Sequence, residues 1–432
     1  GKRVGGVRRA AAALHRWVGL ATAVFLAVAG LTGAAIAFYP ELDAWLNPEL
    51  FRVEARDARP LSPGELARRV EAALPGTRVT LVTIPDRPGW AVRTRVAAID
   101  GAVPGSVWDS DEVYVNPYDG RVLGTRTWGA PRADRAHLMP FIYRLHYSLH
   151  LPGDWGVWLL GAVAISWTLD CFVGAYLTVP RAAPRWRKWG VAWRVKPARL
   201  GYDVHRAGGL WAWPLLLTLA VSSVYLNLAD EVFVPIVRVF SPVAETPQRR
   251  LARVARPEPS PWLDYDAALA AASPHLPAAA RAYRAAWIAY VPALGAYRVG
   301  FDESGRGERA FRVGFHQVFV DANTGRPLAA RGWHGATAGE RFVALQFPLH
   351  SGQLFGLPGR ILIAVAGVLV AVLSITGVVI WLRKRRVRVS VPARGRAGGC
   401  GPSIRRSTSA CSTHSAPSPR KVPISRRPTR ST

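Results

Sequence analysis

The chain has 432 residues, of which 50% are hydrophobic, and it carries a formal net charge of +28. In a soluble protein this charge would suggest nucleic acid, but here it accompanies several apolar stretches of about 20 residues, long enough to cross a bilayer. The positive charge is therefore better explained as the signal that sets the orientation of membrane helices, and we expect no nucleic-acid partner. The three cysteines, Cys171, Cys400 and Cys411, form no CxxC, CxxCH or zinc-type spacing. This argues against disulfides, structural zinc and cysteine-ligated iron–sulfur clusters, and any haem would be held non-covalently.

Four apolar segments predict a polytopic α-helical membrane protein. They cover residues 14–39, 155–179, 204–228 and 359–382. The first is longer than the apolar core of a cleaved signal peptide, about 7–15 residues, so we expect a retained anchor. After the fourth, residues 383–432 are basic and contain no acid, which predicts a disordered cytoplasmic tail. Binding of this tail to anionic membrane lipids and a reading-frame artefact are two alternatives that the sequence leaves open.

Lysine and arginine predict the orientation of these segments. Residues 1–13, the loop 180–203 and "RKRR" at 383–386 are strongly basic. The positive-inside rule places all three in the cytoplasm, together with both termini. The long segments 40–150 and 229–355 then lie outside, and their mixture of acids and bases is typical of soluble domains.

Two similar phrases predict a β-hairpin in each outer segment. They are "EVYVNPYDGRVLG" (112–124) and "QVFVDANTGRPLA" (317–329), in which alternating apolar residues precede a turn with Gly. "LHRWVGL" (14–20) and "VHRAGGL" (204–210) likewise open the first and third apolar segments. We therefore expect residues 1–185 and 199–386 to be degenerate copies, related by a pseudo-two-fold axis along the membrane normal.

Five histidines lie where apolar segments begin, and they are the candidate site residues. His15 and His205 lie at the cytoplasmic ends, and His146, His150 and His350 lie before the outer ends. Each could be an ordinary interfacial polar residue, but the repeated HRxxG phrase favours a function, and its glycine lets a bulky group approach the backbone. Facing imidazoles in a four-helix bundle can hold haem b, and two layers of histidines predict two haems.

The neighbouring Arg16 and Arg206 have two possible roles. They could pair with haem propionates, because arginine matches carboxylate geometry, or they could be positive-inside anchors. Asp170 is the main acid within the apolar segments, and no ExxH pair, Walker A loop, GxGxxG or HExxH is present. We therefore expect an external electron donor, either a quinol, a reduced flavin or a partner reductase.

Several phrases together resemble the PepSY-associated transmembrane family, also described as iron-regulated inner-membrane proteins. They include "LHRWVGLATAVFLAVAGLTG", the two hairpins, "PLHSGQLFGLPGR" and "SITGVVIWLRKRR", and the resemblance covers about residues 8–386. It implies a bacterial inner-membrane protein with an α+β PepSY-like periplasmic domain in each half. Characterised relatives are ferric-siderophore reductases that carry electrons through b haems. By resemblance, His15, His205 and His350 match the histidines that the family carries at the ends of its membrane helices. His146 is preferred to His150 as the fourth iron ligand.

The histidine pattern thus predicts a di-haem b electron-transfer protein, and the resemblance implies that it acts as a reductase of ferric siderophore or another Fe(III) chelate. One alternative is a membrane-anchored PepSY binding or regulatory module without redox activity. The other is a transporter of iron chelate or haem, in which the histidines would pass cargo.

Overall fold

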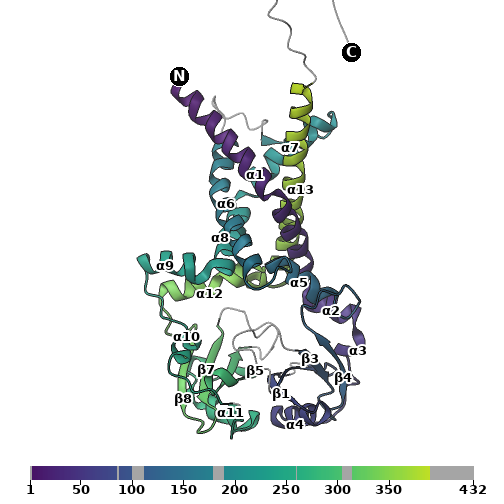
Figure 1. The fold of residues 1–432 in the computed structure, drawn as a ribbon, viewed down its shortest axis with the longest axis vertical. Coiled ribbons are helices and arrows are strands. Elements are labelled where there is room, and N and C mark those ends of the chain that lie inside the picture. Colours follow the sequence, from purple (N-terminus) through teal and green to yellow (C-terminus); the bar gives the residue numbers. More distant parts are fainter. Residues whose placement is uncertain are drawn as a thin grey trace, which may run out of the picture. The chain divides into compact units, whose positions relative to one another are not determined.

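Four long apolar helices run side by side in the computed structural model (Figure 1). The structure describes residues 2–84, 87–99, 111–178, 189–258, 260–303 and 314–389. The helices long and apolar enough to cross a membrane are Gly5–Ile36, Trp155–Thr178, Trp213–Phe240 and Gln353–Arg386. They correspond to helices α1 (Lys2–Ile36), α6 (Trp155–Thr178), α8 (Trp213–Leu228) and α13 (Gly356–Val389) with their extensions. Four apolar helices of this kind indicate a multi-pass membrane protein.

Small residues let two of these helices approach closely. A Cβ atom built on Gly30 of α1 would lie 2.4 Å from the carbonyl oxygen of Gly367 on α13. A Cβ atom built on Gly367 would likewise lie 2.4 Å from the carbonyl oxygen of Gly30. Close backbone approach at small residues is the usual way in which membrane helices pack, because apolar burial provides little driving force between them in lipid.

The third apolar segment differs from the single helix expected over 204–228. It is divided at Ala212 between α7 (Pro197–Trp211) and α8, and Pro214 occupies the first turn of α8. Proline has no backbone N–H and cannot continue the hydrogen bonding of the preceding helix, which is the physical reason for the division. His205 therefore lies on α7 and not on the membrane-crossing helix itself.

Eight strands form one antiparallel sheet in the order β4-β3-β2-β1-β5-β6-β7-β8. Both predicted hairpins are confirmed, as β3 paired with β4 and β7 paired with β8. The sequence did not predict that strands from the two segments would share a sheet, which they do where Leu81 of β1 pairs with Ala289 of β5. The strands are β1 Thr77–Thr83, β2 Val92–Ala98, β3 Asp111–Val115, β4 Val122–Thr127, β5 Arg284–Val291, β6 Ala296–Asp302, β7 His316–Asp321 and β8 Pro327–Gly332.

Two helices pack on the sheet and close its core. Helix α4 (Pro63–Ala73) and helix α11 (Tyr265–Ala272) begin at the N-caps Ser62 and Asp264, whose side chains accept hydrogen bonds from backbone N–H groups. Apolar residues of both helices share one buried cluster with residues of six strands. The Tyr265 hydroxyl also donates to the carbonyl oxygen of Val79 at 2.6 Å, which joins the second strand-bearing segment to the first.

Most of the remaining helices lie, in chain order, between a long helix and a strand. Helix α5 (Leu138–Ser148) precedes α6, and helix α12 (Ala338–His350) precedes α13. The others are α2 Tyr39–Leu46, α3 Pro48–Phe51, α9 Val234–Phe240 and α10 Pro247–Ala252, with a π-helical turn at Ala229–Phe233 and 3-10 turns at Ser273–His275, Ala278–Ala280, Pro292–Leu294 and Gln353–Phe355.

Two sequence predictions fall wholly or partly outside the described residues. The first nine residues of the predicted basic loop, 180–188, are not described, and neither is the tail beyond residue 389 with Cys400 and Cys411. The basic run 383–386 is described, and it forms part of α13.

Candidate functional site

The structure brings four of the five candidate histidines together in two pairs. His15 on α1 and His205 on α7 form the first pair, with ring centroids 6.1 Å apart and ring planes inclined by 61°. His146 on α5 and His350 at the end of α12 form the second pair, with centroids 6.3 Å apart and planes inclined by 54°. Each pair combines a residue from before positions 180–188 with one from after them.

In the first pair, both imidazoles donate a hydrogen bond from Nδ1. The Asp170 carboxylate on α6 accepts from His15, with its oxygens at 2.8 and 3.0 Å from Nδ1. His205 Nδ1 lies 3.0 Å from the carbonyl oxygen of Leu373 and 3.1 Å from the Thr376 hydroxyl, both on α13. Because carboxylate and carbonyl oxygens only accept, Nδ1 carries the proton in both rings.

The second pair has the same pattern with uncharged partners. His146 Nδ1 lies 3.1 Å from both the carbonyl oxygen of Ala29 and the Thr32 hydroxyl on α1. His350 Nδ1 lies 2.9 Å from the Ser222 hydroxyl on α8, and that hydroxyl donates its own proton to backbone carbonyls, so it accepts from the imidazole. Burial lowers the pKa of His146 to about 4, and burial together with His146 lowers the pKa of His350 to about 3. Both rings are therefore neutral at physiological pH.

In the neutral form of each of the four rings, these contacts leave Nε2 as the nitrogen with a lone pair. A neutral imidazole oriented by a hydrogen bond from its other nitrogen is the usual metal-binding form of histidine. Two metal–nitrogen bonds of about 2 Å, together with ~1 Å from each nitrogen to its ring centre, separate the centroids of two imidazoles on one metal by roughly 6 Å. Both pairs have this spacing. In the described part of the chain no group of three or more His, Cys, Asp or Glu could hold a metal ion, and a haem iron needs only two such side chains.

The glycines of the HRxxG phrases border open space. A Cβ atom on Gly19 or on Gly209, each one turn after its histidine, would meet no atom within 4 Å. Both glycines are nevertheless partly buried. A flat group held by the first pair could therefore lie against the backbone of α1 and α7.

The two arginines next to the first pair differ in their surroundings. Arg16 is exposed, and its guanidinium lies 5.2 Å from the Trp17 ring. The Arg206 guanidinium contacts the Asp203 carboxylate at 3.5 Å and the carbonyl oxygen of Gly190 at 3.3 Å, and its Nε is buried without a hydrogen-bond partner. Arg206 thus has an unused buried donor that suits a carboxylate, whereas Arg16 suits the anchor role.

His150 does not join either pair. Its Nε2 donates to the carbonyl oxygen of Phe141 at 2.9 Å, and its ring stacks on the Phe141 ring with centroids 4.4 Å apart. His150 and Leu149 both have positive φ, 55° and 53°, in the turn after α5. The geometry therefore favours His146 over His150 as the partner of His350.

Sequence analysis missed the residues that orient the imidazoles. Thr32, Thr376 and Ser222 are ordinary hydroxyl residues within apolar helices, and Asp170 stood out only as an acid in such a segment. One usable signal was present: a hydroxyl residue follows His15 and His205 at the same separation of 17 residues, at Thr32 and Ser222.

A buried charged cluster between β2, β3 and β4 was also missed. The Arg126 guanidinium contacts the carboxylates of Asp43 at 2.8 Å and Glu112 at 2.9 Å, and all three side chains have no exposed surface. Burial opposes ionisation of Glu112, but Arg93, Arg126 and Arg95 outweigh it and lower the pKa of Glu112 to about 2. The cluster ties α2 to the strands, and its satisfied ion pairs indicate a structural role.

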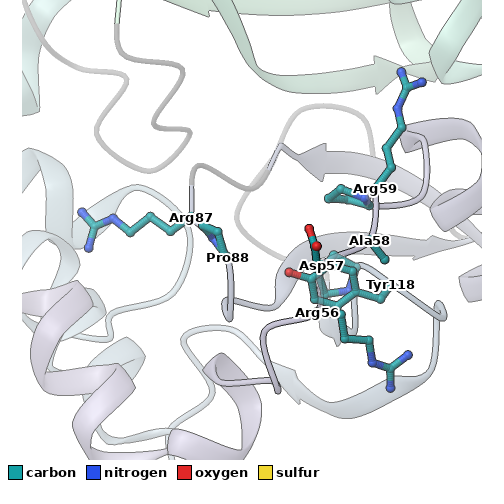
Figure 2. Close-up of a pocket in the computed structure, with 9 residues that line it drawn as sticks. Arg56, Asp57, Ala58, Arg59, Arg87, Pro88 and Tyr118 are labelled. Atoms are coloured by element: carbon teal, nitrogen blue, oxygen red, sulfur yellow. The ribbon is translucent and has the colours of Figure 1, made fainter.

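One pocket of about 520 Å³ lies beside the β3–β4 turn (Figure 2). The side chains of Arg56, Arg59 and Arg87 extend from it in different directions, and the Asp57 carboxylate lies between them (Figure 2). Arg56 also pairs with Asp119 at 3.2 Å. Divergent guanidinium groups cannot clamp one anion, so this pocket is a weaker candidate than the imidazole pairs.

The paired histidines and the sheet lie within one region of similarity to a known protein family. Residues 12–384 match the family described as the PepSY-associated TM region. No curated protein matches the sequence. The matched range includes all four paired histidines and all eight strands. The chain belongs to the PepSY-associated TM region family.

Proposed function

We propose that the protein is a di-haem b electron-transfer protein of a bacterial inner membrane that reduces ferric siderophore or another Fe(III) chelate in the periplasm. The observation that carries the proposal is the presence of two imidazole pairs, each with a centroid separation near 6 Å and with Nδ1 hydrogen-bonded. Imidazoles on facing helices are the usual axial ligands of haem b in helical bundles.

Each residue near the pairs has a defined role in this proposal. His15 and His205 hold one haem and His146 and His350 hold the other, while their Nδ1 partners orient the rings. Arg206 offers its buried Nε to a propionate. The haems supply the one-electron chemistry, and the protein supplies orientation and tuning.

The separation of the pairs suits transfer across a membrane. Thr32, which contacts His146, lies 17 residues after His15 on the same helix, and a rise of about 1.5 Å per residue places the two levels roughly 25 Å apart. The two levels therefore lie near the two faces of a hydrocarbon core about 30 Å thick. An external quinol, reduced flavin or partner reductase would supply electrons at the first pair, and the Fe(III) chelate would accept them beyond the second.

Orientation and internal symmetry form part of the same proposal. The basic residues of the N-terminus, of the loop before α7 and of the end of α13 favour cytoplasmic termini. We regard the two halves as degenerate copies because each provides one histidine to each pair, and because the 17-residue separation of histidine and hydroxyl occurs in both. The sheet order also arranges the four strands of each half about the β1–β5 junction.

The decisive experiment measures haem in the detergent-purified protein. We expect a bis-imidazole b-type spectrum with about two haems per chain, and loss of about one haem in each of His15→Ala and His350→Ala. His150→Ala is the matched control and should keep both haems, because its Nε2 is bound to a backbone carbonyl. Unchanged haem content in His15→Ala or His350→Ala would contradict the assignment. Protein that stays colourless after haem supplementation would favour the PepSY binding-module alternative.

A further inference from the structure

The four imidazole Nδ1 atoms have unequal partners. Three of the four bind to uncharged oxygens, from a backbone carbonyl with a hydroxyl or from a hydroxyl alone. Each of these hydroxyls, on Thr32, Thr376 and Ser222, is itself bonded to the carbonyl four residues earlier on its helix. The fourth imidazole, that of His15, binds the carboxylate of Asp170.

We propose that Asp170 makes the haem site at the first pair the lower-potential site and thereby directs electrons from the first pair to the second. This inference rests on the proposed function, because it assigns a potential to groups that the proposed function places at the pairs. Asp170 acts through His15 and is therefore a positioning residue.

The geometry makes the interaction strong. Both Asp170 oxygens lie within 3.0 Å of His15 Nδ1, and the Asp170 side chain is only 12% exposed. A charge-assisted hydrogen bond is roughly twice as strong as a neutral one, and a buried charge is screened less than an exposed one. Gly174 lies one turn after Asp170, and a Cβ atom there would be 3.6 Å from His15 Cε1, so the imidazole lies beside the backbone of α6.

The carboxylate favours the more positive oxidation state of a metal bound to His15. By accepting a hydrogen bond from Nδ1 the carboxylate raises the basicity of Nε2, and it adds a negative charge beside the metal. Both effects stabilise Fe(III) relative to Fe(II) and so lower the reduction potential. At the second pair the Nδ1 partners of His146 and His350 carry no charge, so this stabilisation is missing there.

The resulting step is a single electron transfer that runs downhill. With haem bound, His15 and His205 would hold the iron that gives up one electron, and His146 and His350 would hold the iron that receives it, so one iron would be oxidised and the other reduced by the same single electron. No bond is broken and no proton is transferred between the two sites. The electron lost at the first pair would be replaced by the external donor of the proposed function, a quinol, a reduced flavin or a partner reductase.

The first test measures midpoint potentials by spectroelectrochemistry on the full chain in detergent. His350→Ala, which keeps only the first pair, should retain the lower of the two wild-type potentials, and His15→Ala should retain the higher. The opposite assignment, or equal potentials, would overturn the inference while leaving the proposed function intact. Wild-type protein that binds no haem would instead remove the proposed function itself.

The second test is Asp170→Asn, which keeps an oxygen that accepts from Nδ1 but removes the charge. We expect the lower potential to rise by an amount equivalent to roughly tenfold in the reduction equilibrium, about 59 mV for one electron, with the higher potential unchanged. Asp264→Asn is the matched control, because Asp264 is an exposed helix cap that asparagine can replace. An unshifted lower potential in Asp170→Asn with two haems bound would overturn the inference. If Asp170→Asn does not bind haem, the potentials of the single haems in His350→Ala and His15→Ala still decide which pair has the lower reduction potential.

Discussion

Glu112 illustrates how single residues hold the strand-bearing part of the protein together. Its carboxylate accepts hydrogen bonds from Arg126 at 2.9 Å and from the Tyr114 hydroxyl at 3.1 Å, and it has no exposed surface. An ion pair removed from water stabilises a fold only when its partners satisfy it closely, and removal of one partner costs several kcal/mol.

Glu112 should make stability depend on pH in the acidic range. Its pKa is about 2 in the folded protein against a reference of 4.5, so the unfolded chain binds a proton first as the pH falls. The stabilisation, about 3 kcal/mol, is present above pH 4.5 and is lost as the pH falls towards 2. We expect Glu112→Gln to lower the free energy of unfolding by about 3 kcal/mol at pH 7 and to flatten this acid dependence.

Unfolding followed by circular dichroism in detergent between pH 7 and pH 2 measures both effects. Glu65→Gln is the matched control, because Glu65 forms exposed ion pairs with Arg68 and Arg69 and should change little. Equal stability of Glu112→Gln and wild type at pH 7 would rule out the structural role of the cluster.

At the scale of elements, the crossing of α1 and α13 depends on two glycines. Gly30→Ala would place a methyl group 2.4 Å from the carbonyl oxygen of Gly367, which is backbone and cannot rotate away. The helices would have to separate, so we expect a loss of about 1–3 kcal/mol in the free energy of unfolding. Gly6→Ala is the control on the same helix, because a Cβ atom there meets nothing within 4 Å. A melting temperature of Gly30→Ala in detergent equal to that of Gly6→Ala would contradict close packing at this crossing.

Sequence patterns predicted elements better than their connections. Four apolar helices and two hairpins were predictable, because a run of about 20 apolar residues and an alternating strand–turn–strand phrase are local signals. The division of the third segment at Ala212 was missed, although Pro214 marks it. The residues on both sides of Ala212 are mostly apolar, so hydropathy alone does not reveal that one helix ends there and another begins. The pairing of β1 with β5 joins residues about 200 positions apart and has no local signal.

The same contrast applies to the candidate site. His15, His205, His146 and His350 were identified from their repeated positions, and the structure pairs them. Their Nδ1 partners were not identified from the sequence. A hydroxyl in an apolar helix usually donates to a backbone carbonyl of the same helix, as those of Thr32, Thr376 and Ser222 also do. Only three-dimensional proximity distinguishes these hydroxyls from the others.

At the scale of the whole molecule, neither half contains a complete site. His15 and His146 precede positions 180–188, whereas His205 and His350 follow them, and each pair takes one histidine from each side. The halves are also joined through the shared sheet, where three residue pairs connect β1 with β5, and through the contact of Tyr265 with Val79. The haem binding that we propose for the two pairs should therefore require both halves together.

Expression of the chain as two pieces, cut between residues 184 and 185, tests this requirement. Each piece expressed alone offers one imidazole per site, so we expect neither to give a bis-imidazole spectrum. Co-expressed pieces should associate through the helices and the sheet, co-purify on a tag carried by one of them, and recover about two haems per pair of pieces. Co-expression of the pieces with His205→Ala in the second should recover only one haem, which controls for haem bound non-specifically to apolar helices. A single piece that binds haem with two axial histidines would show that the ligands are paired within a half, and would overturn the assignment of ligand pairs across the two halves.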